Sequence, residues 1–213
     1  MYFKQFNVGG DRNFAYLIAD ESSMQAAVVD PAYSPQILVE EAEKLGFEIK
    51  YIINTHDHYD HTNGNKKLKA STGAQIVQNA SAYGNADIRV NDNGSLWLGG
   101  LELKFIHTPG HTQDSMCIMV ENMLCTGDTL FVGKVGGTDF SEGARLEYNS
   151  LRHKLMTLPE DTRVWPGHDY GVAPSSTIGH EKRTNPFLLR PDFESFVDLK
   201  RNWAEYKLKH GIA

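Results

Sequence analysis

The chain has 213 residues, 40% of them hydrophobic, which is enough to bury one substantial core. Its net charge of −6 gives no basic footprint for nucleic acid. The first ten residues lack the basic start and continuous apolar core of a signal peptide, and no apolar run reaches the length of a transmembrane helix. We therefore expect a single domain over residues 1–213 that is cytoplasmic and binds neither nucleic acid nor a membrane.

Apolar periodicity predicts three strands before the first helix. These strands are expected at 3–8, 13–19 and 25–29. The helix that follows has Ser34 as its N-cap, Pro35 as its first residue and Gly46 after its last turn. A buried strand over 49–54 comes next, and it runs directly into a polar segment rich in histidine.

Strands and helices continue to alternate along the rest of the chain. Further strands are expected at 75–77, 95–98, 101–106, 115–120 and 123–126, and helices at 65–71, 146–158 and 192–209. The last helix has an amphipathic face that should pack on the body of the protein. Cys117 and Cys125 lie in neighbouring strands without the spacing of metal ligands, so we expect them to be buried free thiols.

Histidine and aspartate residues cluster where the expected strands end. The strand over 49–54 runs into residues 55–61, which read Thr-His-Asp-His-Tyr-Asp-His, and later strands lead into Pro-Gly-His, Gly-Asp-Thr and Pro-Gly-His. Together these segments supply seven candidate ligands: His56, His58, Asp60, His61, His111, Asp128 and His168. Because a loop at a strand end can aim several side chains at one point, we expect strand ends to deliver all seven.

The residue types in this cluster indicate transition metals. Imidazole binds zinc and iron well, and a carboxylate can bridge two cations and offset their charge. Cysteine is absent from the cluster, which argues against a structural zinc site. The spacing is typical of a two-metal hydrolytic site, in which one metal lowers the pKa of a bound water to about 7 and the other polarises the carbonyl under attack.

The order and context of these motifs resemble the metallo-β-lactamase superfamily, and within it the branch that contains glyoxalase II (hydroxyacylglutathione hydrolase) and the persulfide dioxygenases. The resemblance covers essentially the whole chain, as far as the segment 181–188. It implies an α/β fold in four layers, an αβ/βα sandwich of two mixed sheets flanked by helices. The site would lie at one edge, between the sheets.

Carried over by position, the resemblance implies two groups of metal ligands. The first metal would be held by His56, His58 and His111, the second by Asp60, His61 and His168, and Asp128 would bridge them. The two divalent ions would be zinc, iron or manganese. Asp60 or Asp128 would orient a metal-bound hydroxide for attack on an acyl carbon. Class B1 β-lactamases carry cysteine where this chain has Asp128, which disfavours that subfamily.

The expected reaction is hydrolysis of a small-molecule thioester, either an S-acylglutathione or an ester of a related thiol. Tyr170 matches an aromatic residue beside the substrate pocket of the relatives. Glutathione-using relatives place Arg or Lys where this chain has Gly137, so that the substrate carboxylates would need Lys134, Lys182 or Arg183. The identity of the thiol and the oligomeric state stay open.

Two other functions would use the same residues. Persulfide dioxygenases resemble the chain around Gly136 to Phe140 and Pro166 to Tyr170, and they hold a single iron with two histidines and one carboxylate. Here those ligands would be His56, His111 and Asp128. The motif alone does not separate the two reactions. A third hypothesis is a metal-binding module without turnover, which the retention of every ligand disfavours.

Overall fold

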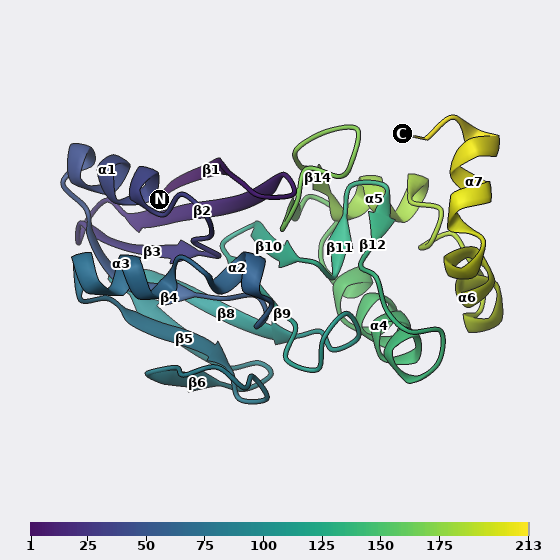
Figure 1. The fold of residues 1–213 in the computed structure, drawn as a ribbon, viewed down its shortest axis with the longest axis horizontal. Coiled ribbons are helices and arrows are strands. Elements are labelled where there is room, and N and C mark those ends of the chain that lie inside the picture. The colour runs from purple at the N-terminus through teal and green to yellow at the C-terminus, as the bar shows by residue number, and fades with distance from the viewer. Residues whose placement is uncertain (213) are drawn as a thin grey trace.

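The computed structural model describes residues 1–212, whose strands form two six-stranded sheets that face each other (Figure 1). The first sheet has the order β1-β2-β3-β4-β5-β6. Its strands are β1 (Tyr2–Gly9), β2 (Asn13–Asp20), β3 (Gln25–Val29), β4 (Glu48–Ile53), β5 (Gln75–Asn79) and β6 (Ile88–Val90). The first three strands are antiparallel and β3 to β6 are parallel, so this sheet is mixed.

The second sheet has the order β14-β13-β10-β9-β8-β7. Its strands are β7 (Ser95–Leu98), β8 (Leu101–His107), β9 (Met116–Val120), β10 (Met123–Gly127), β13 (Arg163–Pro166) and β14 (Ser176–Thr177). Only the β10 and β13 pair is parallel, so this sheet is mixed as well. A small hairpin of β11 (Leu130–Phe131) and β12 (Lys134–Val135) stands beside it.

Helices cover the outer face of each sheet. On the first sheet lie α1 (Gln36–Leu45) and α3 (Asn65–Thr72) (Figure 1). The one-turn helix α2 (Tyr59–Thr62) comes between β4 and α3 in the chain. On the second sheet lie α4 (Glu142–His153), the 3-10 turn η1 (Leu155–Thr157), α5 (Ile178–Thr184), α6 (Phe193–Arg201) and α7 (Trp203–His210). The four layers are therefore helices, sheet, sheet and helices, as the resemblance to the metallo-β-lactamase superfamily implies.

Strand β2 shows why the layers hold together. Its side chains alternate between two faces, as the period of two in a strand requires. Tyr16 and Ile18 are buried between the sheets with Phe105 of β8, whereas Leu17 packs under α1 with Leu38. All eight residues of β2 are buried, so this strand belongs to two cores at once.

Two predicted helices differ from the structure. The helix expected over 192–209 is two helices, because the side-chain amide of Asn202 donates to the backbone and carboxylate oxygens of Asp198 and ends α6 there. The helix expected over 146–158 begins earlier, at Glu142, and gives way to the 3-10 turn after His153. Gly46 ends α1 with a left-handed backbone, as predicted.

Two smaller predictions also have outcomes. Cys117 and Cys125 are buried free thiols, as expected. Burial raises the pKa of the Cys117 thiol to about 12, which makes it unreactive. Within residues 1–212, none of the helices combines the length and the hydropathy needed to cross a bilayer.

Candidate metal centre

All seven candidate ligands gather at one edge of the sandwich. Five lie on loops that follow β4, β8, β10 and β13. The expectation that strand ends deliver all seven is wrong for Asp60 and His61, which lie on α2. That single helical turn follows the loop after β4 and points both side chains back toward the sheet edge, so the loop and α2 act as one unit.

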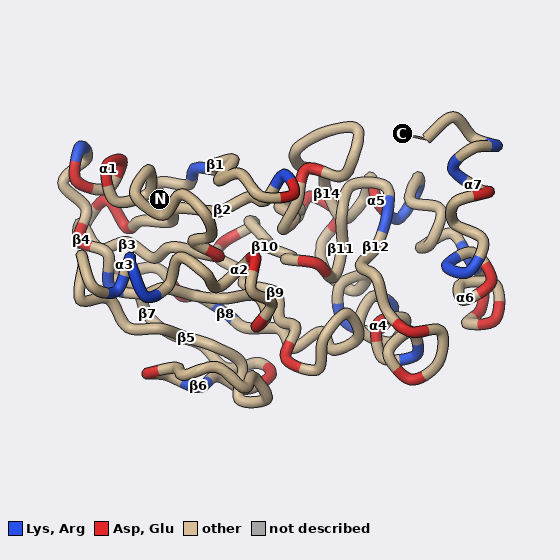
Figure 2. Tube along the Cα trace, viewed as in Figure 1, with Lys and Arg blue, Asp and Glu red and all other residues tan. Residues whose placement is uncertain are grey.

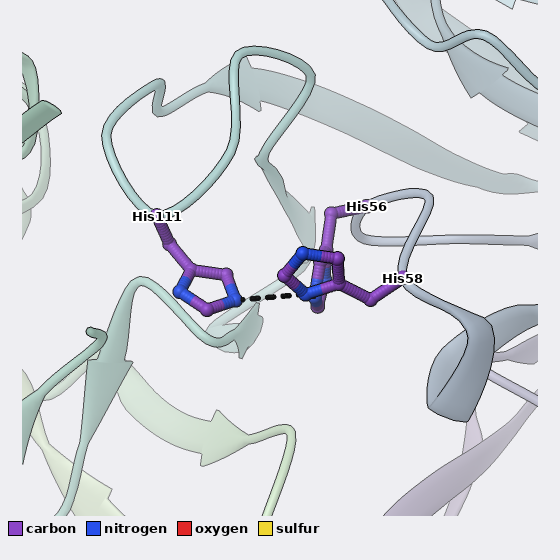
Figure 3. A group of neighbouring side chains, drawn as sticks. All are labelled: His56, His58 and His111. Atoms are coloured by element: carbon purple, nitrogen blue, oxygen red, sulfur yellow. Dashed lines mark hydrogen bonds between the residues drawn. The ribbon is translucent and has the colours of Figure 1, made fainter. Parts of the chain in front are cut away.

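The first group of side chains consists of three histidines (Figure 3). The Nδ1 atom of His58 lies 3.0 Å from Nε2 of His56 and 3.1 Å from Nε2 of His111. The three rings meet nearly edge to face. They come from the loops after β4 and β8, two strands that belong to different sheets, so this group closes the gap between the sheets.

The second group consists of Asp60, His61 and His168. The Nε2 atoms of the two histidines lie 3.2 Å apart, and Oδ2 of Asp60 lies 3.6 Å from that of His61 and 3.4 Å from that of His168. His168 follows β13 of the second sheet, whereas the other two residues follow β4 of the first. This group therefore also joins the two sheets.

Asp128 lies between the two groups. One of its carboxylate oxygens, Oδ1, is 3.5 Å from Nε2 of His61, and the other, Oδ2, is 3.6 Å from Nε2 of His111 and 3.4 Å from that of His168. Its side chain is buried, and among residues 1–212 nothing donates a hydrogen bond to Oδ1. A buried carboxylate oxygen without a donor is costly unless a cation balances it.

The donor set fits metal ions. Five imidazoles direct ring nitrogens at two points, and two carboxylates add oxygen donors, which is a mixed site suited to zinc, iron or manganese. Ring nitrogens that point at each other across 3.0 to 3.2 Å repel through their lone pairs unless a proton or a cation lies between them. The first group and the second group could each hold one ion, with Asp128 in contact with both.

Hydrogen bonds on the far side of each ring fix how the histidines point. Thr55 Oγ1 lies 3.0 Å from Nδ1 of His56 and can accept its hydrogen. The carbonyl oxygens of Gly137 and Asp11 accept hydrogen bonds from Nδ1 of His111 and of His168, at 2.7 and 2.9 Å. When Nδ1 carries the hydrogen, Nε2 is free to bind a metal.

Asp30 and Asn13 support the site, and neither was expected from the sequence. Asp30 is buried and accepts from Nδ1 of His61 at 3.0 Å, and also from the backbone N–H and the hydroxyl of Thr55. Asn13 donates to Oδ2 of Asp60 at 3.1 Å. The one signal for Asp30 is its position directly after the apolar strand 25–29, the placement that the ligands themselves share.

Burial and neighbouring charges move the pKa values of these groups in opposite directions. Burial lowers the pKa of His56 and of His111. Burial also acts on His61, but the carboxylates of Asp128 and Asp30 outweigh it and raise that pKa to about 9. Burial opposes ionisation of Asp128, yet the surrounding imidazoles, His61 first, hold its pKa well below the usual range. The centre is thus ready to exchange a proton for a cation.

Two of the predicted substrate residues, Tyr170 and Lys134, line a cavity of about 640 Å³. The ring of Tyr170 stacks on that of His168, with centroids 4.5 Å apart, and its hydroxyl donates to Asp11. Lys134 Nζ lies 4.5 Å from the centroid of the Tyr170 ring. Arg12 lies 5.0 Å from the same centroid, and no motif in the sequence singles it out.

The other two predicted substrate residues lie elsewhere. Lys182 Nζ is 3.5 Å from the carbonyl oxygen of Leu158, and the guanidinium of the exposed Arg183 is 2.8 Å from the carboxylate of Glu160. Neither lines the cavity, because the face of α5 that does so carries His180 and Thr184. The structure therefore places Tyr170 against His168 and Lys134 against Tyr170, and leaves Lys182 and Arg183 away from both.

Known proteins are similar to this chain in both sequence and architecture. The model of the metallo-β-lactamase superfamily matches residues 8–168. Human mitochondrial persulfide dioxygenase ETHE1 is 33% identical over 198 residues, which covers 89% of this chain and 76% of that protein. The probable hydroxyacylglutathione hydrolase glo2 of Schizosaccharomyces pombe is 30% identical over 201 residues, with 91% and 76% covered.

A solved structure agrees with these matches. The crystal structure of ETHE1 from Myxococcus xanthus superposes with a TM-score of 0.90 at 33% identity and covers 95% of this chain and 91% of that one. The relatives thus carry the names of two different enzymes on one architecture. The chain belongs to the metallo-β-lactamase superfamily, a family of metal-binding enzymes.

Proposed function

We propose that this protein is a metal-dependent hydrolase of the glyoxalase II type, which cleaves a small-molecule thioester. The observation that carries the proposal is the second ligand group, Asp60, His61 and His168, which has supporting hydrogen bonds of its own from Asn13, to Asp30 and to the Asp11 carbonyl. A reaction at a single metal does not require this group. Two metals therefore account for more of the buried polar groups than one does.

Two divalent ions at this centre, zinc, iron or manganese, would supply a water of lowered pKa and a Lewis acid for the acyl oxygen. The side chains of the protein would supply the charge balance and accept the proton. Asp128 places a buried negative charge between the two groups, and Asp60, half-exposed and held by Asn13, is positioned to take up a proton from water. A thiolate leaving group needs little help from an acid, which agrees with the lack of an assigned proton donor.

The cavity beside His168 gives the thiol portion of the substrate a place to bind. Arg12, Lys134 and Lys207 of α7 contribute basic side chains to its lining, in a chain whose net charge is −6. Figure 2 shows basic residues on β12 and along α7. Burial, and then repulsion from Lys207, lowers the pKa of Lys134, so a bound anion would relieve an unfavourable arrangement. We infer an anionic tail on the thiol.

An iron-dependent persulfide dioxygenase is the second candidate. It is favoured by the 33% identity to human persulfide dioxygenase and by the TM-score of 0.90 to the Myxococcus xanthus structure. This reaction would use one iron on His56, His111 and Asp128. A cytoplasmic location remains a prediction of the sequence under either function.

An assay under anaerobic conditions tests the proposal. Protein reconstituted with zinc is incubated with S-lactoylglutathione, and the released thiol and free acid are quantified by mass spectrometry. We expect equimolar products without oxygen. A preparation that binds metal but releases no thiol from this ester, or from the corresponding esters of coenzyme A and cysteine, would refute the proposal that the protein is a thioester hydrolase. The same protein would then be loaded with iron and tested on glutathione persulfide with oxygen.

A further inference from the structure

A buried ion pair joins α4 to α6 behind the candidate metal centre. The ammonium of Lys200 lies 2.6 Å from Oε2 of Glu147, and their side chains are 5% and 0% exposed. Taking two charges out of water costs several kcal/mol per ion, so such a pair is weak evidence for stability in itself. An apolar pair of the same size would fill this space with less cost. The position of the pair suggests another role.

Glu147 lies directly under the loop that carries His111. A Cβ atom built on Gly110 would be 2.4 Å from Cβ of Glu147, so only glycine fits at this closest approach of loop to helix. One turn further along α4, the hydroxyl of Ser150 donates to the carbonyl oxygen of Pro109 at 2.8 Å. The backbone that precedes His111 therefore rests on α4 at Glu147.

Lys200 contacts the segment that holds the other side of the same histidine. Its ammonium donates to the carbonyl oxygen of Gly136 at 2.6 Å. The next carbonyl oxygen, that of Gly137, accepts the hydrogen bond from Nδ1 of His111 at 2.7 Å. The ion pair therefore contacts two segments that position the His111 imidazole. Glu147 packs against the backbone that precedes His111, and Lys200 binds the loop whose next carbonyl oxygen accepts from its ring.

We propose that Glu147 and Lys200 are positioning residues for His111, which lock the 136–137 loop and the 109–110 loop in the one arrangement that aims its Nε2 at the first ligand group. The charge on Lys200 is required because a carbonyl oxygen and a carboxylate must be held together in a dry site. This inference rests on the proposed role of His111 in metal binding, and not on which reaction the metal centre performs.

Variants at the pair test the proposal through metal binding. Lys200→Met breaks the pair, the double variant Glu147→Leu/Lys200→Met replaces it with apolar groups, and Lys182→Met is the matched control on α5. For each, unfolding is followed by circular dichroism, and cobalt(II) affinity is measured by competition with a chelator. The visible spectrum of the bound cobalt reports the ligand geometry.

We expect Lys200→Met to lower the melting temperature and the double variant to recover most of it, because no buried charge is left unpaired. Both should lose at least about tenfold in affinity for one cobalt equivalent and show an altered spectrum, while the control matches the wild type. A loss smaller than tenfold in the double variant would mean that the pair is merely structural and would overturn the proposal.

A second variant decides the matter if neither of these folds. Lys200→Gln keeps a donor for the Gly136 carbonyl but lacks the charge that Glu147 requires. We expect at least about tenfold weaker cobalt binding in Lys200→Gln as well, and an affinity closer to that of the wild type would overturn the proposal. Wild-type protein that binds cobalt but hydrolyses no thioester would refute the proposed function and leave this test intact.

Discussion

The imidazole of His111 donates its Nδ1 hydrogen to the carbonyl oxygen of Gly137, 2.7 Å away. This glycine provides a backbone acceptor for a candidate ligand, at a position where the resemblance to glutathione-using enzymes implies a basic side chain. A Cβ atom at Gly137 would meet nothing within 4 Å, and its φ lies outside the left-handed region. Gly137 therefore acts on His111 through its carbonyl group, and the space where a side chain at position 137 would lie is open.

Gly137→Arg should lower the KM for S-lactoylglutathione by about tenfold and change kcat little, because a new charged hydrogen bond to a substrate carboxylate stabilises ground state and transition state equally. Initial rates of thiol release give both constants. Gly133→Arg is an unsuitable control because Gly133 has a φ of +75°, so Gly137→Ala, which adds no charge, serves instead. An equal fall in KM for Gly137→Ala would show that charge is not the cause.

Asp128→Ala should remove stoichiometric metal binding and reduce kcat/KM by more than about 100-fold, the upper range for loss of a group that only supports a ligand. The reason is that one carboxylate contacts both ligand groups, and water cannot balance two cations there. Metal content by atomic emission and turnover are measured on the same sample. Exposed Asp161→Ala is the control, and full metal content in Asp128→Ala would contradict the bridging role.

Lys134→Ala should raise the KM for an anionic thioester by about tenfold without lowering kcat, since it removes one charged contact in the cavity beside Tyr170. Lys182→Ala should leave both constants unchanged, because that lysine faces the carbonyl of Leu158 and not the cavity. A neutral S-acyl thiol serves as the reference substrate. Equal effects of the two substitutions would remove the support for an anion site in this cavity.

Metal affinity should depend on pH through His61. Its pKa of about 9 in the metal-free protein means that a metal must displace a proton there at neutral pH. Affinity should therefore rise by at least about tenfold per pH unit between pH 6 and 8 and level off above pH 9. Chelator competition at fixed ionic strength measures this slope, and a flat profile over the same interval would show that His61 is already neutral.

The sequence predicts the candidate ligands because their segments follow apolar runs and because histidine and aspartate are rare in such dense spacing, and the structure brings these side chains together. The residues that orient these side chains could not be recognised from the sequence. Asn13 and Asp30 act on Asp60 and His61 from distant parts of the chain, and no local pattern links them. Tyr170 was predicted to bind substrate because it lies two residues after His168; the structure stacks its ring on that histidine, and its role with substrate stays a prediction.

The buried Glu147 and Lys200 show a different reason for failure. A charged residue of an amphipathic helix is normally assigned to the solvent-facing side, so Glu147 alone predicts exposure, whereas Lys200 lies on the face of the last predicted helix that was expected to pack on the body. Only the packing of α6 on α4 brings them together. The break at Asn202 was missed for a related reason, because the apolar face continues across it while a side-chain hydrogen bond to Asp198 ends α6.

The most direct test of a two-metal hydrolase is a metal titration of the metal-free protein. Zinc is added in fractions of an equivalent while thioester hydrolysis is followed, and the same titration is run with Asp60→Ala and His168→Ala. We predict that most hydrolysis appears with the second equivalent in the wild type, and that both variants bind one equivalent and stay largely inactive. Full hydrolysis at one equivalent, or oxygen uptake on glutathione persulfide with iron and no thioester cleavage, would contradict the account.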